Sequence, residues 1–147
     1  MKPVLCKSLC AAVFSIMPVL SYAQAVPIDN VDQIEHALMH GLSVRSTFDL
    51  SACKNDNPAQ PSPPVRGGLV IDPFNILPNG VLAFANTHGT VDPAGRALTE
   101  IIRFRVNPSG VVNVSVSTFA MPSYQLLNAT ALTCGLSADV HFFASFL

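Results

Sequence analysis

His88 and Asp92 are the two side chains whose types and spacing most resemble an acid–base pair. A histidine exchanges a proton near neutral pH, and a nearby carboxylate can orient its ring, as in hydrolases. Such a hydrolase also needs a nucleophile, and Ser46, Ser51 and Ser123 lie in no G-x-S-x-G elbow. We therefore assign no catalytic residue and keep His88 and Asp92 as candidates for a small hydrolase.

Arg103 and Arg105 form a second group with possible chemistry, together with Glu100. The two arginines alternate with apolar residues, so both should lie on one face of a strand. Their guanidinium groups would suit an anionic ligand or the carboxylates of a partner, although a solvated face with cross-strand ion pairs is the more common explanation for such residues. Glu100 falls on the apolar side of the strand, which predicts a β-bulge beside it or a carboxylate that points inward.

His36 and His40 are four residues apart in a predicted helix, a spacing that can hold a metal ion. No third ligand lies nearby, and the neighbouring residues resemble a solvated helix face. Cys53 and Cys134 also lack a second cysteine or histidine at zinc-site spacing. We therefore expect no metal and no cofactor.

The elements that must position these residues are mainly strands. Residues 29–41 predict one helix, with Asp29 or Asn30 as its cap and Gly41 at its end. From residue 44 the apolar period is two, and turns such as Asn79-Gly80 separate the runs. The predicted strands are 44–50, 69–77 (an edge strand or bulge because of Pro73), 81–88, 96–106, 111–120 and 140–147.

Two segments are not predicted as strands. Residues 51–64 form a long polar loop rich in proline, and residues 121–133 predict a short helix or an irregular segment after Pro122. The resulting fold class is mainly β: an antiparallel meander sheet, or a small barrel or sandwich, with one N-terminal helix. The single helix would also allow the class α+β, but helix makes up only a minor part of the predicted fold.

Cys53 and Cys134 are the two cysteines that follow the N-terminal apolar segment, and they predict a disulfide. Two free thiols, or partners in different molecules, are the alternatives. The bridge would close a loop of about 80 residues, which the chain-entropy model values at roughly 4 kcal/mol. Because Cys53 follows the first predicted strand and Cys134 precedes the last, those strands should be neighbours, with the two Cα atoms within about 7 Å.

The N-terminus has the order of a secretory signal peptide. Lys2 and Lys7 precede an apolar run at 9–20, and small residues follow up to Ala23 and Ala25. We expect residues 1–23 to be the signal, with cleavage after Ala23 or Ala25, and residues 26–147 to form one β-rich domain. The run of about 12 apolar residues is shorter than the roughly 20 of a membrane span, so no stable anchor is expected after cleavage.

The charge balance argues against some partners. From residue 24 onward the chain has six lysines and arginines and nine aspartates and glutamates, a net charge of −3. No basic patch of the kind that nucleic acids require is evident, so nucleic acid is not an expected partner. The 50% apolar composition and the 12% of charged residues indicate a folded domain.

Motifs spread along the chain also carry a resemblance. They are D-L-S-A-C at 49–53, G-G at 67–68, N-G-V-L-A-F-A-N-T-H at 79–88, R-F-R-V at 103–106 with Gly110, P-S-Y at 122–124, and Cys134 before V-H-F at 140–142. In this order the chain resembles the VirK family, small exported bacterial proteins first noted in the virulence region of a plant-transforming bacterium. The resemblance implies a Gram-negative source, export and a link to host-associated life, and it supplies no catalytic residues.

Three functions are consistent with these patterns. The favoured one is an exported, non-enzymatic accessory or binding protein associated with host interaction, periplasmic or secreted, whose partner is an unidentified protein or small ligand. The alternative is a small periplasmic hydrolase that uses His88 and Asp92. The third is a small outer-membrane barrel, which the absence of Trp and the presence of only Tyr22 and Tyr124 disfavour, since such barrels carry aromatic girdles.

Overall fold

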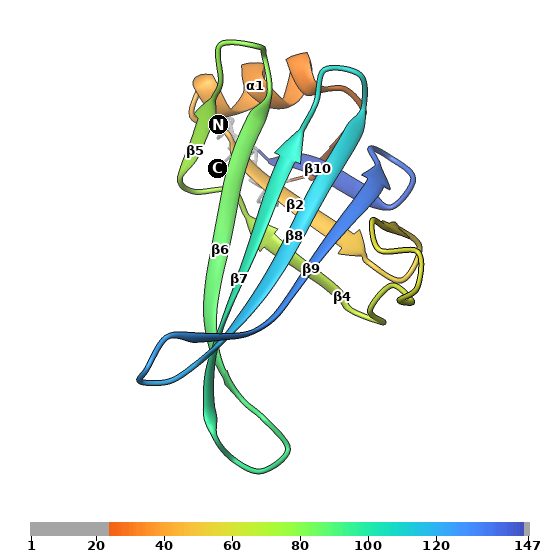
Figure 1. The fold of residues 1–147 in the computed structure, drawn as a ribbon. Coiled ribbons are helices and arrows are strands. Elements are labelled where there is room, and N and C mark those ends of the chain that lie inside the picture. The colour runs from red at the N-terminus through yellow and green to blue at the C-terminus, as the bar shows by residue number, and fades with distance from the viewer. Residues whose placement is uncertain (1–23, 146–147) are drawn as a thin grey trace, which may run out of the picture.

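Two antiparallel β-sheets and one helix make up residues 24–145, the part of the chain that the computed structural model describes (Figure 1). The four-stranded sheet contains β1 (Val26–Ile28), β2 (Ser43–Asp49), β4 (Arg66–Val70) and β10 (Val140–Ser145). The six-stranded sheet contains β3 (Lys54–Asn55), β5 (Phe74–Ile76), β6 (Leu82–Val91), β7 (Ala97–Val106), β8 (Val111–Ala120) and β9 (Gln125–Gly135). The strand orders are β1-β10-β2-β4 and β3-β9-β8-β7-β6-β5.

This architecture confirms the predicted fold class, a mainly β protein with one N-terminal helix. The two sheets face each other across a shared core and are open, since each ends in outer strands that do not pair with one another. Among the alternatives, the sandwich is therefore correct for the described residues and the closed barrel is wrong. The signal peptide at 1–23 and the last two residues of the predicted strand 140–147 lie outside the described residues.

Helix α1 (Val31–Met39) covers one end of the sandwich (Figure 1). Asn30 caps it, because its Oδ1 accepts a hydrogen bond from the Gln33 N–H at 2.9 Å. Beyond the helix, Gly41 has a φ of +74°, the left-handed conformation that glycine favours at a helix end. Ile34 and Leu38 are buried in the core. Among the described residues, no helix has both the length and the apolar character that crossing a membrane requires.

The strands β6, β7 and β8 form the predicted meander. Tight turns join β5 to β6, β6 to β7 and β7 to β8, and they contain Gly80, Gly95 and Gly110, which have positive φ. β6 continues three residues beyond the predicted strand 81–88, to Val91, because β7 supplies a partner for every one of its residues.

The structure corrects the predictions for residues 121–133 and 69–77. Residues 121–133 are not a short helix: β9 begins at Gln125 and pairs along β8, which overrides the weak local pattern. The predicted strand 69–77 is two strands in different sheets, β4 and β5, because Pro73 interrupts it after a cis Asp72–Pro73 bond.

Phe104 on β7 lies at the centre of the core and is 1% exposed. Its ring is stacked on Phe84 with centroids 4.9 Å apart, and Phe48 from the opposite sheet lies at 5.4 Å. Both cysteines are also buried and form a disulfide, with Cα atoms 4.5 Å apart. β2 pairs with β10 along their lengths, so the prediction that the first and last long strands are neighbours is confirmed.

The distal halves of β6 to β9 extend beyond the four-stranded sheet as a long twisted ribbon (Figure 1). On the inner face of β7, side chains are more exposed in the distal half than where the four-stranded sheet covers the strand. The Glu100 side chain is 31% exposed, whereas Ile102 is 7% and Phe104 is 1% exposed. Pairing of β7 with both neighbours is regular at Glu100, so the predicted bulge there is wrong. Glu100 occupies the core face because the opposite sheet no longer covers that position fully.

Candidate functional site

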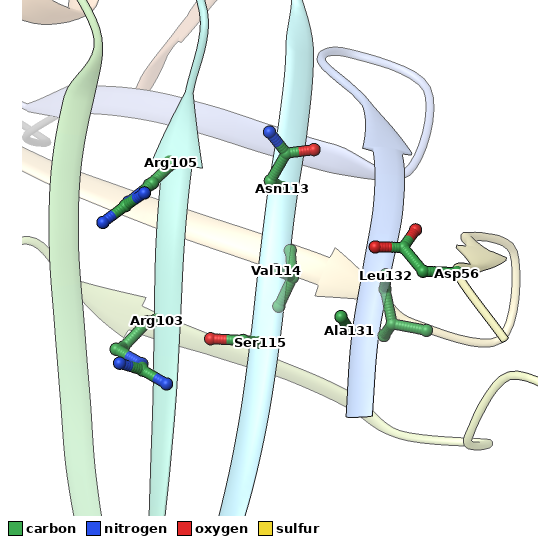
Figure 2. Close-up of a pocket in the computed structure, with 8 residues that line it drawn as sticks. All are labelled: Asp56, Arg103, Arg105, Asn113, Val114, Ser115, Ala131 and Leu132. Atoms are coloured by element: carbon green, nitrogen blue, oxygen red, sulfur yellow. The ribbon is translucent and has the colours of Figure 1, made fainter. Parts of the chain in front are cut away.

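Arg103 and Arg105 project from β7 on the outer face of the six-stranded sheet, away from the core (Figure 2). Alternation along the strand produces this placement, because Phe104 and Val106 point inward and are buried. The cross-strand neighbours of Arg103 are Ala85 and Ser115, which are short side chains. Both arginines are therefore exposed, as expected for residues on a common strand face.

The two arginines border a shallow depression of about 270 Å³ in this face. Asp56 lies across the depression from Arg103, beyond strands β8 and β9 (Figure 2). The depression is lined by Asp56, Arg103, Arg105, Asn113, Val114, Ser115, Ala131 and Leu132.

Asp56 reaches this face through the short strand β3. Lys54 of β3 pairs with Thr133 of β9, and the Asp56 N–H then donates to the Ala131 carbonyl at 3.0 Å. The Thr133 hydroxyl donates to Asp56 Oδ1, also at 3.0 Å. This hydrogen bond holds the carboxylate at the side of the depression away from the arginines.

Charge at the depression is not balanced locally. Within residues 24–145, no carboxylate lies within 4.0 Å of Arg103 or Arg105, whereas Arg66 and Arg96 each contact an aspartate. Two adjacent guanidinium groups without a carboxylate partner create a positive potential on an otherwise acidic protein. Because guanidinium presents a planar fork of donors, this arrangement can bind a carboxylate or phosphate group.

Two other exposed arginines, Arg66 and Arg96, each form an ion pair with an aspartate. Arg66 Nε is 2.6 Å from Asp49 Oδ2, and Arg96 Nε is 2.6 Å from Asp92 Oδ2. The Ser51 hydroxyl, and then Arg66, lower the pKa of Asp49. The backbone N–H of Arg96, and then its guanidinium, lower the pKa of Asp92. These carboxylates stabilise turns and leave their arginines engaged.

A second depression of about 160 Å³ adjoins the first on the same face and shares Arg103 with it. Ile101, Ser117 and Phe119 complete its lining. The outer face therefore changes from charged around Arg105 to apolar around Phe119. A ligand that spans both depressions would combine an anionic group with an apolar group.

His88 and Asp92 are not brought together as an acid–base pair. His88 Nε2 lies 3.0 Å from Glu100 Oε2 on the neighbouring strand. Asp92 instead accepts hydrogen bonds from the backbone N–H groups of Ala94 and Arg96, at 2.9 and 2.8 Å. Glu100 is also separated from Arg103 and Arg105, since it lies on the opposite face of β7.

His88 and Glu100 border a third cavity, of about 230 Å³, which opens between β4 and the inner face of β6 and β7. This inner cleft is lined by Phe48 of β2, by residues of β4 and by polar and apolar residues of β6 and β7. Its residues are Phe48, Val65, Arg66, Gly67, Gly68, Leu69, Asn86, His88, Glu100 and Ile102.

His36 and His40 stack on each other on α1, with ring centroids 4.0 Å apart. His40 Nδ1 lies 2.8 Å from the His36 carbonyl oxygen, an interaction that engages this nitrogen within the helix end. Among residues 24–145, no three His, Cys, Asp or Glu side chains are grouped closely enough to hold a metal ion.

Sequence reasoning identified the two arginines but not their surroundings. The alternation of Asn113 and Ser115 with valines is typical of a strand with one solvated face, and it could have placed both residues beside the arginines. Asp56 carried no such signal, because its position depends on the long-range pairing of β3 with β9.

Comparison with known proteins identifies the family. Residues 27–124 match the family model described as VirK protein. The chain belongs to the VirK family. This membership confirms the resemblance that the sequence motifs indicated. It supports an association with virulence and assigns no molecular activity.

Three known proteins illustrate the similarity. An uncharacterized protein in the pinF2 3′ region of Rhizobium radiobacter is 33% identical over 131 residues, 88% of this chain and 90% of that protein. The uncharacterized protein y4wH of Sinorhizobium fredii (strain NBRC 101917 / NGR234) is 33% identical over 114 residues, 77% of this chain and 79% of its own length. The crystal structure of lpg1832, a VirK family protein from Legionella pneumophila, covers 81% of this chain and 99% of its own, with a TM-score of 0.72 and 17% identity. This last match shows a shared fold.

Proposed function

We propose that this protein is an exported, non-enzymatic binding protein that acts in host interaction and holds an anionic group of its partner on Arg103 and Arg105. One observation carries the proposal: both guanidinium groups border the outer depression, and within residues 24–145 neither has a carboxylate within 4.0 Å. Carboxylate groups of a protein or of a small ligand would complete the hydrogen-bonding capacity of the two arginines.

The surroundings of the arginines suit such a ligand. Ala83, Ala85 and Ser115 are the short cross-strand neighbours, so little side-chain volume separates an incoming anion from the guanidinium groups. The arginines are exposed, so each contact with an anion contributes modestly and weakens as salt rises. We therefore expect binding that relies on several contacts at once and is fast and salt-dependent.

Export to the periplasm or the medium is the second part of the proposal. It rests on the order of charged, apolar and small residues at the N-terminus and on the Cys53–Cys134 disulfide, which favours an oxidising compartment. The Gram-negative source implied by the family resemblance makes the periplasm the first compartment that the mature protein enters. Virulence association comes from the family and agrees with a function outside the cytoplasm.

Calorimetric binding of poly-L-glutamate at low salt tests the anion-binding face. The double variant Arg103→Gln/Arg105→Gln is compared with Arg66→Gln/Arg96→Gln, which has the same net charge but alters arginines already paired with aspartates. We expect the first variant to bind at least tenfold more weakly, about 1.4 kcal/mol, and the second to bind within about threefold of the parent. Equal losses in both variants would refute a specific site and indicate a general charge effect.

A further inference from the structure

The strand β6 has an exposed edge along its distal half. β5 pairs only with residues Leu82, Ala83 and Phe84 of β6, whereas β7 pairs with all of β6 on its other side. Residues 85–91 are all exposed, and within the described chain no other strand pairs with them. Their outward backbone groups are therefore available for pairing with an added strand.

Features that commonly protect such edges are missing from this one. Residues 85–91 contain no proline and no lysine, aspartate or glutamate, and their pairing with β7 runs without a register shift. The free edge of β9 differs, because a register shift at Thr118/Phe119 leaves Leu127 as an extra residue in that strand. A regular added strand thus fits β6 better than β9.

The outer side of this edge lies close to the arginine face. Ala85 pairs with Arg103, so the Ala85 methyl group is the only side chain of that row between Arg103 and the edge. Neighbouring strands are about 4.8 Å apart, so a residue added opposite Ala85 would lie about 10 Å from the Arg103 backbone. The extended side chains of an arginine and a glutamate can together span that distance.

The inner side of the same edge lies beside the inner cleft. Asn86 and His88 point to this side and line the cleft with Phe48 and Ile102 at its apolar part. A cavity of about 230 Å³ is many times the 10–15 Å³ that a single water needs, so it has room for a side chain. Residues of an added strand would point alternately to the arginine face and into this cleft.

We propose that the exposed edge of β6 binds an extended acidic segment of a partner protein by β-strand addition. Backbone hydrogen bonds to 85–91 supply the pairing. An acidic residue opposite Ala85 contacts Arg103, and its sequence neighbour, opposite Asn86, places an apolar side chain in the inner cleft. The proposal rests on the anion-binding function. The partner is a polypeptide because the unpaired backbone of β6 can bind another strand, and Arg103 lies beside this edge and can bind an acidic side chain of that strand.

Selection from a displayed library of random ten-residue peptides tests this inference with the exported protein as bait. We expect enriched peptides to combine an acidic residue with an adjacent apolar residue and to perturb the backbone amide signals of 85–91 in NMR spectra. Failure to enrich any peptide over an unrelated bait would overturn the proposal, as would perturbation confined to β9 or β4.

Two matched variants separate this edge from a general charge effect. Ala85→Glu places a carboxylate directly opposite Arg103 and beside the open edge, whereas Ala129→Glu places one at an exposed position of β9, opposite Ser117 and away from β6. We expect at least a tenfold loss of peptide affinity for Ala85→Glu and less than threefold for Ala129→Glu. Arg103→Gln, which introduces no new carboxylate, should also weaken binding and is informative if Ala85→Glu misfolds. Equal effects of the two glutamate variants would contradict the proposal.

The poly-L-glutamate assay distinguishes failure of strand addition from failure of the anion-binding function. If poly-L-glutamate requires Arg103 and Arg105 but no selected peptide requires the β6 edge, the anion-binding function stands and strand addition is wrong. If neither ligand depends on Arg103, the anion-binding function itself fails.

Discussion

His88 and Glu100 face each other on β6 and β7, with Nε2 and Oε2 3.0 Å apart, on the same sheet face as the buried Phe104. Their side chains are 46% and 31% exposed, whereas Phe104 is 1% exposed. A single strand face thus passes from the core to a solvated region within a few residues, and the energetic cost of substitution should change with it.

Substitutions along this face should show that difference. Phe104→Ala removes the stacking on Phe84 and leaves a cavity, and we expect it to lower the free energy of unfolding by about 3–5 kcal/mol. Glu100→Gln should change it by at most about 1 kcal/mol, since exposed ion pairs contribute little. Urea denaturation of both variants measures the values. Similar losses of unfolding free energy for both variants would contradict the conclusion that the core ends between Phe104 and Glu100.

Removal of the Cys53–Cys134 disulfide should destabilise the domain substantially. The bridge joins residues 81 apart in sequence, and the chain-entropy model gives roughly 4 kcal/mol for a loop of this size. We expect the double variant Cys53→Ser/Cys134→Ser to lose a few kcal/mol in urea denaturation. A thiol assay on the unreduced, unfolded protein should detect no free thiol from these cysteines, and two reactive thiols would show that the bridge is absent.

Export should leave a defined N-terminus. We expect N-terminal sequencing of protein from the periplasm or medium to begin at Gln24 or Val26, after cleavage by signal peptidase. Protein from those fractions that still begins with Met1 would contradict the proposed localisation.

Stability should fall in acid partly through Asp49 and Asp92. Their pKa values are lowered from 3.8, by Ser51 and Arg66 for Asp49 and by Arg96 for Asp92, so the unfolded state binds more protons than the folded state near pH 4. Their stabilising contribution is thus complete above about pH 4 and is lost as the pH falls through the lower folded values. Urea midpoints measured downward from neutral pH should fall less steeply for Asp49→Asn/Asp92→Asn than for the parent; an unchanged slope would contradict this assignment.

The sequence predicted those elements whose signals are local. The turn residues Asn79-Gly80 marked the hairpin of β5 and β6, and the apolar period of two marked the strands of the meander. β9 was missed because Leu126, Leu127, Asn128 and Ala129 show no period-two pattern, and only pairing with β8 makes them a strand. The same reason applies to β3, and hence to the place of Asp56 at the site. Arg103 and Arg105 could be predicted as a pair, but the free edge of β6 depends on where β5 ends, which no local signal indicates.

Arginine side-chain NMR provides the most direct test of the anion-binding face. The chain has five arginines, Arg45, Arg66, Arg96, Arg103 and Arg105, so their Nε–H signals can be followed individually as poly-L-glutamate is added at low salt. We expect the signals of Arg103 and Arg105 to shift first and furthest, because only these two border the outer depression. Shifts at Arg66 and Arg96 that are as large as those at Arg103 and Arg105, or larger, would contradict the account.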